Sequence, residues 1–210
     1  LRVMEPLSLE LGAYYRALFD LWTRSPLATP PLARSVEQAG SGRAYGAQLV
    51  IRLSPLRNVS GSLSYSLSRS QRRDSPDAPL RLADLDQPHL LQLAVRYVLF
   101  GFGIGVRLRY SSGLPRTEVI GAYYDARDDR FDPLFGPQNA ARLPAFVQLD
   151  AQIDRQFVIR NRLRITISVD VQNLTNHPNA EELVYRYDFQ EPQFIRGLPL
   201  LANLGLRVSF

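Results

Sequence analysis

Arginine dominates the reactive side chains of this sequence, because all 25 of its basic residues are arginine. A guanidinium group binds carboxylate or phosphate through two parallel hydrogen bonds, so a well-placed arginine recognises anionic groups. Against 20 acidic residues the formal charge is +5, but the arginines are scattered and form no basic run. Because nucleic-acid binding requires a clustered basic surface, we expect no nucleic-acid partner.

Three aspartates are candidates for acid–base chemistry. Asp150 and Asp154 fall on one side of a predicted strand, and Asp170 falls on the corresponding side of the next one. Paired carboxylates can transfer protons, but the same sides also carry Arg164 and Arg207. The simpler interpretation is a ladder of ion pairs between neighbouring strands.

No combination of nucleophile, base and orienting group stands out elsewhere. His89 and His177 each neighbour a proline, which favours a role in turns, and the chain contains no cysteine for a thiolate metal site. The acidic segment 125–132 could offer oxygen ligands to calcium, but it lacks the glycine and the spacing of an EF-hand and is interpreted as a solvated loop. We therefore expect no enzyme, no catalytic residue, no metal site and no cofactor.

Aromatic side chains are concentrated in two long segments without a strand pattern. Ligand pockets are rich in aromatic residues, so these segments are candidates for substrate capture. The candidate residues are Tyr123, Tyr124, Phe131, Tyr185 and Tyr187. Packing of the loops against one another would explain the same aromatic content.

Side-chain alternation indicates the elements that must position these residues. A β-strand between lipid and water is apolar at every second position. In segment 162–172 the apolar positions are Leu163, Ile165, Ile167, Val169 and Val171, and the polar ones are Arg164, Thr166, Ser168, Asp170 and Gln172. Segment 202–210 alternates in the same way, and one side of the strand after Val59 carries five serines.

The same alternation begins near residues 7, 44, 59, 91, 102 and 147, which gives about eight strands. The predicted fold class is all-β, an antiparallel transmembrane β-barrel segment. Six arginines occupy the polar sides and are expected to face the lumen: Arg52, Arg96, Arg107, Arg109, Arg164 and Arg207. No apolar run reaches the roughly 18 residues that a transmembrane helix requires, which excludes a helical membrane protein.

The predicted links alternate between short and long. The short ones are 54–59, 99–102 and 158–162, and the long ones are 22–43, 70–89, 112–145 and 176–200. Outer-membrane barrels have short periplasmic turns and longer extracellular loops, so this alternation supports a barrel. Aromatic residues near the predicted strand ends, including Phe102 and Phe157, fit the interfacial girdles of such barrels.

Several motifs resemble those of the TonB-dependent outer-membrane receptor family. Val171–Asn176 (VQNLTN) is similar to the family's penultimate-strand "NLFN" signature, and Leu204–Phe210 resembles the closing strand. Ser112–Thr117 (SGLPRT), Asp86–His89 (DQPH) and the strand from Leu9 resemble further family segments.

This resemblance implies that residues 1–210 are the C-terminal part of the barrel and that the plug domain is absent from the chain. It implies a protein of the bacterial cell outer membrane that imports a scarce nutrient such as a metal chelate, with siderophore uptake as the typical case. The implied partners are outer-membrane lipid, the remainder of the receptor with its plug, and the TonB energy-coupling complex through the missing N-terminal part. A further partner is the barrel-assembly machinery, for which Leu206, Val208 and Phe210 would form the signal. The arginines would contact carboxylates of the plug or guide an anionic substrate.

Three alternatives remain open. The first is a self-contained eight-stranded outer-membrane barrel with a structural, adhesive or enzymatic role. Its serine-rich inner face argues against it, because small side chains fill a narrow barrel poorly. The second is an outer-membrane enzyme, which would need a convergent acid–base set. The third is a soluble β-sandwich.

Overall fold

The structure is a computed structural model that describes every residue except 1, 5, 25–35 and 161–162. Sixteen strands lie within the described residues. They are β1 (Arg2–Met4), β2 (Leu7–Arg24), β3 (Val36–Leu56), β4 (Val59–Arg73), β5 (Arg81–Leu82), β6 (His89–Leu99), β7 (Phe102–Ser111), β8 (Pro115–Arg116), β9 (Val119–Asp125), β10 (Arg130–Phe135), β11 (Ala141–Arg142), β12 (Phe146–Ile159), β13 (Leu163–Gln172), β14 (Ala180–Tyr185), β15 (Pro192–Arg196) and β16 (Leu201–Ser209). In this part of the chain no helix has the length and apolar character to cross a membrane.

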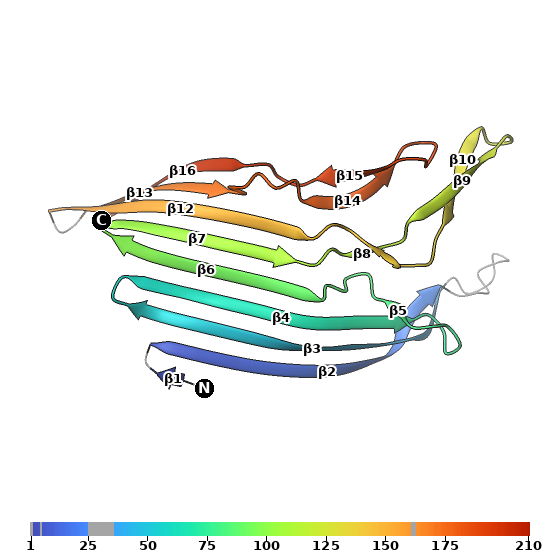
Figure 1. Ribbon diagram of the computed structural model, residues 1–210, viewed down its shortest axis with the longest axis horizontal. Helices are drawn as coiled ribbons and strands as arrows, with labels where there is room; N and C mark the ends of the chain where they lie inside the picture. Colours follow the sequence, from blue (N-terminus) through green and yellow to red (C-terminus); the bar gives the residue numbers. More distant parts are fainter. Residues whose placement is uncertain (1, 5, 25–35, 161–162) are drawn as a thin grey trace.

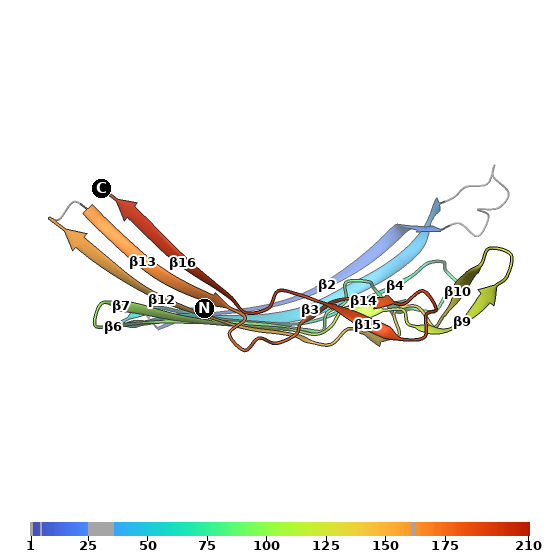
Figure 2. The same ribbon diagram turned by 90° about the horizontal axis from the view of Figure 1, so that it is seen from above.

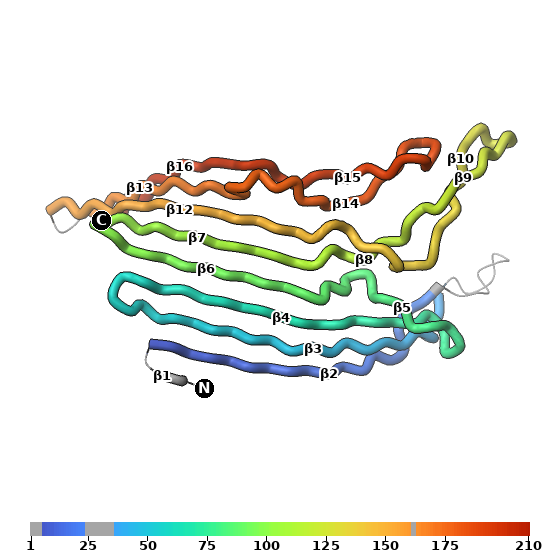
Figure 3. Tube along the Cα trace, in the orientation of Figure 1, coloured from blue at the N-terminus to red at the C-terminus, as the bar shows by residue number. Residues whose placement is uncertain are grey.

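One antiparallel sheet of ten strands forms the body of the molecule. Its order is β1-β2-β3-β4-β6-β7-β12-β13-β16, with β5 pairing alongside β4 (Figures 1 and 3). The sequence predicts about eight strands, and the two short strands β1 and β5 are additional. The all-β class and the antiparallel arrangement are confirmed.

The sheet does not close among the described residues. Strand β16 pairs only with β13, and β1 pairs only with β2, so both ends of the sheet are open edges. Figure 2 shows that the sheet is curved. Strands β13 and β16, at their ends near the C-terminus, bend to the same side as β2 and β3 do at their opposite ends. The described residues therefore form an open, curved sheet and not a self-contained closed barrel.

Short and long connections lie at opposite ends of the strands. The turns β3–β4 and β6–β7 lie at one end, and the connections β4–β6, β7–β12 and β13–β16 lie at the other (Figure 1). We refer to these as the short-turn end and the long-loop end. Strand β12 ends and β13 begins at the short-turn end, but residues 161–162 of the predicted link 158–162 lie outside the described residues.

The long connections contain strands that alternation did not reveal. The hairpin β9–β10 and the pair β8–β11 lie within 112–145, and the hairpin β14–β15 lies within 176–200. Strand β3 begins at Val36, earlier than the predicted start near residue 44, and it stays paired with β2 as far as Arg24. The predicted link 22–43 is therefore partly strand, and its residues 25–35 lie outside the described residues. The strands of the two hairpins have only five to seven residues and lack the repeated alternation that makes a strand visible in sequence.

The register of the main sheet pairs like with like. Between β13 and β16 the apolar matches are Ile165 with Val208, Ile167 with Leu206 and Val169 with Leu204. The polar matches are Arg164 with Ser209, Thr166 with Arg207 and Asp170 with Asn203. Because directly opposed residues point to the same side of a sheet, one face is polar and the other apolar. A shift of one residue in the pairing of a strand would move all of its apolar side chains to the polar face.

Little of the apolar surface is buried within the described residues. Among them Leu143 is the one large hydrophobic side chain that is buried, at 6% exposure, whereas Leu204 and Leu206 are 79% and 71% exposed. A water-soluble domain of this size would bury most of its large aliphatic side chains. The apolar face thus has no protein partner among the described residues.

Asn173 fixes the point where β13 leaves the sheet. It adopts a left-handed backbone conformation (φ 49°), and its side chain is 2% exposed. Its Nδ2 donates to the carbonyl oxygens of His177 (3.0 Å) and Leu198 (3.1 Å), while its Oδ1 accepts from the His177 N–H (3.0 Å). Its own N–H donates to Asp150 Oδ1 (3.0 Å). One side chain thus satisfies three backbone groups at the base of the β14–β15 hairpin.

Two further asparagines of this segment act in the same way. Asn176, also left-handed (φ 50°), accepts a hydrogen bond from the Leu200 N–H at its Oδ1 (3.0 Å). Asn179 Oδ1 accepts a hydrogen bond from the Val147 N–H (2.8 Å), and Asn179 Nδ2 donates to the Val147 carbonyl oxygen (2.9 Å). Asn173 and Asn176 of the VQNLTN segment, and Asn179 beyond it, therefore cap backbone groups, since asparagine carries both a donor and an acceptor. At Asn173 and Asn176 its tolerance of the left-handed region also matters.

We expect Asn173→Ala to lower the free energy of unfolding by about 2–4 kcal/mol, because it leaves buried backbone groups unpaired and places alanine at a positive φ. Urea unfolding in detergent micelles would measure the loss. Asn173→Gly is the matched variant, because it tolerates the positive φ but lacks the hydrogen bonds, and it should lose less. An alanine variant as stable as the wild type would contradict this role.

Candidate ligand-binding site

The six arginines predicted to face the lumen all lie on the polar face of the sheet. The pairing carries this face from strand to strand, because Arg52 lies opposite Ser62 and Arg107 opposite Asp150. Arg96 lies opposite Ser60, and Arg164 lies opposite Ser209. The residues come from β3, β6, β7, β13 and β16, so a wide polar surface carries them.

Three of the six form ion pairs. Arg96 Nη2 donates to Asp154 Oδ2 at 2.8 Å, Arg109 Nη2 lies 3.6 Å from Asp150 Oδ2, and Arg52 contacts Glu10. The sequence predicts that Asp150 and Asp154 lie beside Arg164 and Arg207, but their partners come from β6 and β7. The reason is lateral order, since β12 lies between β7 and β13.

Two glycines of β7, Gly103 and Gly105, lie on the polar face beside one of these ion pairs. Arg96 on β6 reaches Asp154 on β12 across the intervening strand, over Gly103. A Cβ atom added at Gly103 would lie 2.0 Å from Arg96 Nη2 and 2.8 Å from Asp154 Oδ1. At Gly105, on the same face, an added Cβ would meet nothing closer than 3.7 Å. Only the first glycine is required by the ion pair.

A hollow of about 700 Å³ lies over the polar face. Its charged lining consists of Arg52, Arg96, Arg107, Arg109, Asp150 and Asp170. Among the described residues Arg52, Arg96 and Arg109 are paired with carboxylates, so Arg107 is the lining arginine without an ion pair. Guanidinium groups bind anionic ligands and acidic protein surfaces, so either could contact Arg107 or exchange with these ion pairs.

The loop aromatics form a second candidate surface at the long-loop end. Phe131 on β10 contacts Tyr124 on β9, with ring centroids 5.3 Å apart, and Tyr187 beyond β14, at 6.0 Å. The structure thus brings together three of the five predicted capture residues from two different loops. Tyr123 lies on β9 and is 54% exposed. Tyr185 belongs to a separate small pocket.

That pocket has a volume of about 280 Å³ and lies between the β8–β11 pair and the β14–β15 hairpin. Tyr185 packs against Phe189 at 6.2 Å, and its hydroxyl accepts a hydrogen bond from the Val119 N–H at 3.0 Å. Arg116 forms a two-pronged contact with Glu182, at 2.8 and 3.1 Å. The Arg116 hydrogen bond lowers the pKa of Glu182, with help from the Leu183 N–H. The Tyr185–Val119 hydrogen bond and the Arg116–Glu182 contact both join the two loops.

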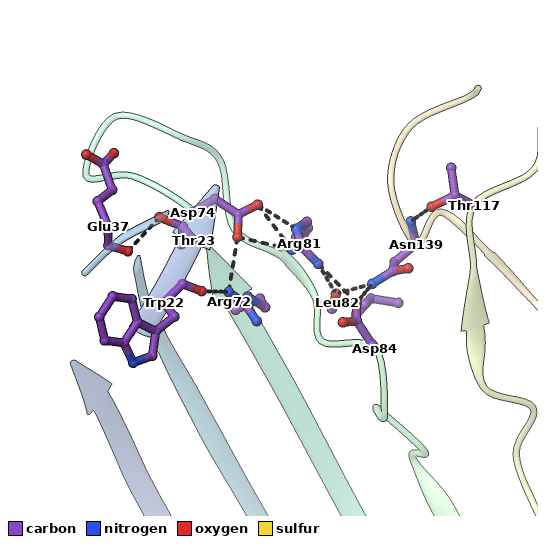
Figure 4. Close-up of polar contacts among 10 residues, drawn as sticks. All are labelled: Trp22, Thr23, Glu37, Arg72, Asp74, Arg81, Leu82, Asp84, Thr117 and Asn139. Carbon is purple, nitrogen blue, oxygen red and sulfur yellow. Dashed lines mark hydrogen bonds and ion pairs between the residues drawn. The ribbon is translucent and has the colours of Figure 1, made fainter. Parts of the chain in front are cut away.

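A polar network holds the long loops to the sheet (Figure 4). Arg81 donates from Nε and Nη2 to the two carboxylate oxygens of Asp74, each at 3.1 Å, and Arg72 Nη2 lies 3.2 Å from the same group. Asn139, from the β7–β12 connection, donates to Asp84 Oδ1 at 2.6 Å. This hydrogen bond lowers the pKa of Asp84. The network therefore links the β4–β6 and β7–β12 connections.

Asp86 was not recognised from sequence as an anchoring residue. It is 1% exposed, contacts Arg142 through its carboxylate, and accepts from the Ser70 N–H at 2.5 Å. The Arg142 guanidinium also donates to the carbonyl oxygens of Asp86 (2.7 Å) and Gly113 (2.9 Å). Asp86 of the DQPH segment is thus a buried junction between two long connections. An isolated aspartate in a loop carries no sequence signal of burial.

The residues assigned to the barrel-assembly signal lie at the open edge. Leu206 and Val208 are on the apolar face of β16, 71% and 51% exposed, and Phe210 follows the strand. No contact within the described residues covers this edge beyond β13.

The described residues define an all-antiparallel, curved β-sheet with one polar and one apolar face. Its fold is similar to a solved structure of the FrpB iron transporter from Neisseria meningitidis (F3-3 variant), with a TM-score of 0.59 and 16% sequence identity. The match covers 95% of this chain and 28% of that chain, so this chain corresponds to less than a third of the transporter's length. No protein-family model and no curated protein sequence matches the chain. The likeness is one of fold.

We expect Gly103→Ala to displace Arg96 and break its pair with Asp154, which is 15% exposed in its side chain. An unpaired, largely buried carboxylate should destabilise the sheet by about 1–3 kcal/mol in urea unfolding. Gly105→Ala is the matched control and should cost much less. In the Arg96→Gln background the Gly103→Ala change should add almost nothing to the loss of stability. An additive effect would contradict the claim that Gly103 makes room for the Arg96–Asp154 ion pair.

Proposed function

We propose that this chain is part of the wall of an outer-membrane transport barrel, in a TonB-dependent receptor that imports a scarce nutrient such as a metal chelate. The observation that carries the proposal is the sorting of a curved, open, antiparallel sheet into one polar and one uncovered apolar face. The fold likeness to an iron transporter supports a transport role.

The apolar face fits contact with lipid. Inside a bilayer every backbone polar group must be paired within the protein, so spanning strands occur in closed barrels. The two open edges of this sheet would therefore pair with further strands of the same barrel. In this arrangement β16 and its Leu206, Val208 and Phe210 would engage the barrel-assembly machinery, and the plug and the TonB complex would act through the rest of the receptor.

The two candidate surfaces fit successive stages of uptake. The aromatic cluster of Tyr124, Phe131 and Tyr187 lies at the long-loop end, where a substrate from outside the cell would arrive first. The arginine-lined hollow lies over the polar face, where it suits an anionic chelate or acidic groups of a plug. The role proposed is transport rather than catalysis.

Uptake of ⁵⁵Fe-labelled ferric chelates tests the function in cells that carry the complete natural protein containing these residues, compared with cells that lack it. We expect uptake to depend on the protein. Phe131→Ala should raise the half-saturating chelate concentration about tenfold, equivalent to about 1.4 kcal/mol and within the usual value of an aromatic contact. Phe135→Ala, in the same hairpin but outside the cluster, should leave it unchanged. Equal uptake with and without the protein would reject iron chelates as its substrates.

A further inference from the structure

Arg155 interrupts the apolar face. It lies on β12, directly opposite Phe102 on β7 and Ile167 on β13. Its neighbours on the same side of its own strand are Ile153 and Phe157. An exposed cation therefore stands in the surface that the proposed function assigns to lipid.

Two aromatic rings flank the Arg155 guanidinium. Its Cζ lies 4.5 Å from the ring centroid of Phe102 and 5.2 Å from that of Phe157. Both distances are within the range of cation–π attraction, which positions the group without satisfying its hydrogen-bond donors. Among the described residues no carboxylate pairs with Arg155.

Other arginines on this face have protein acceptors. Near the long-loop end Arg43 Nε donates to Gln71 at 2.9 Å, Arg73 Nε donates to Ser41 at 2.8 Å, and Arg69 lies 3.7 Å from Asp86. Arg155 differs because its flanking groups are aromatic and aliphatic. Its five N–H donors need an acceptor from outside the sheet.

The position of Arg155 along the strands indicates where that acceptor lies. Its partner Phe102 is the first residue of β7 after the β6–β7 turn, so Arg155 lies toward the short-turn end. An arginine on the lipid face is costly at the bilayer midplane but cheap near the interface, where its long side chain extends to the headgroups.

We propose that Arg155, whose guanidinium lies within cation–π distance of Phe102 and Phe157, binds the phosphate of an anionic phospholipid headgroup in the leaflet at the short-turn end. The inference rests on the proposed function, because it requires the apolar face to contact lipid. A phosphate offers the two acceptors that a guanidinium fork prefers, and a headgroup with net negative charge also balances the unpaired cation.

The test uses the complete natural protein containing these residues, extracted from the outer-membrane fraction in mild detergent and titrated with phosphatidylglycerol or phosphatidylcholine. Native mass spectrometry counts the lipids retained. The variants are Arg155→Gln, Arg155→Lys and Arg207→Gln. Arg207 lies opposite Thr166, itself opposite Gln156, so this control removes an arginine from nearly the same height on the other face.

We expect the wild type and Arg207→Gln to retain phosphatidylglycerol in preference to phosphatidylcholine. Arg155→Gln should need about tenfold more phosphatidylglycerol for equal occupancy, the ratio expected on losing one charge-assisted two-pronged contact. Arg155→Lys should be intermediate, since an ammonium keeps the charge but not the fork. Equal retention by the wild type and Arg155→Gln, with the protein in the membrane fraction, would overturn the lipid site alone. A protein missing from the outer-membrane fraction would overturn the proposed function as well.

Discussion

The register of the main antiparallel sheet is the constraint on which the rest of the structure depends. From β2 to β16 it places most apolar residues opposite apolar residues and most polar residues opposite polar ones, so that one alternation in sequence becomes two faces in space. A packed hydrophobic core does not supply the order, because large side chains such as Leu204 are mostly exposed. Backbone hydrogen bonds between neighbouring strands and the matched faces hold the sheet together, and on the proposed function lipid would cover what the protein leaves bare.

Polar anchors take the place of a core at the long-loop end. Asp86 and Asn173 are buried to 1% and 2% exposure, and both satisfy backbone groups where strands leave the sheet. The Asp74–Arg81 pair and the Asn139–Asp84 contact connect loops that are far apart in sequence. On the proposed function, these contacts would fix the loops that carry the aromatic cluster, and a rigid site lowers the entropic cost of holding a ligand.

Alternation made the main strands and the position of the six arginines on the polar face predictable, because side-chain direction repeats every two residues in a strand. It could not give the partners of those arginines, which depend on lateral strand order and on one glycine, Gly103. The strands within the long connections could not be predicted from sequence either, since β9–β10 and β14–β15 are short and carry no two-residue pattern. Of the residues predicted to capture substrate, Tyr124, Phe131 and Tyr187 lie in contact, whereas Tyr185 lies in a separate pocket. That meeting depends on tertiary placement, which sequence spacing does not encode.

The central claim is that the apolar face contacts lipid and the polar face contacts water. A nitroxide scan along β13 of the complete natural protein in its membrane tests it directly, and the absence of native cysteine in this chain makes single labels from Leu163 to Gln172 straightforward to place. The account predicts that collision rates with oxygen peak at Ile165, Ile167 and Val169, and that rates with a water-soluble nickel chelate peak at the residues between them. Rates without a two-residue period, or with the two probes exchanged, would contradict it.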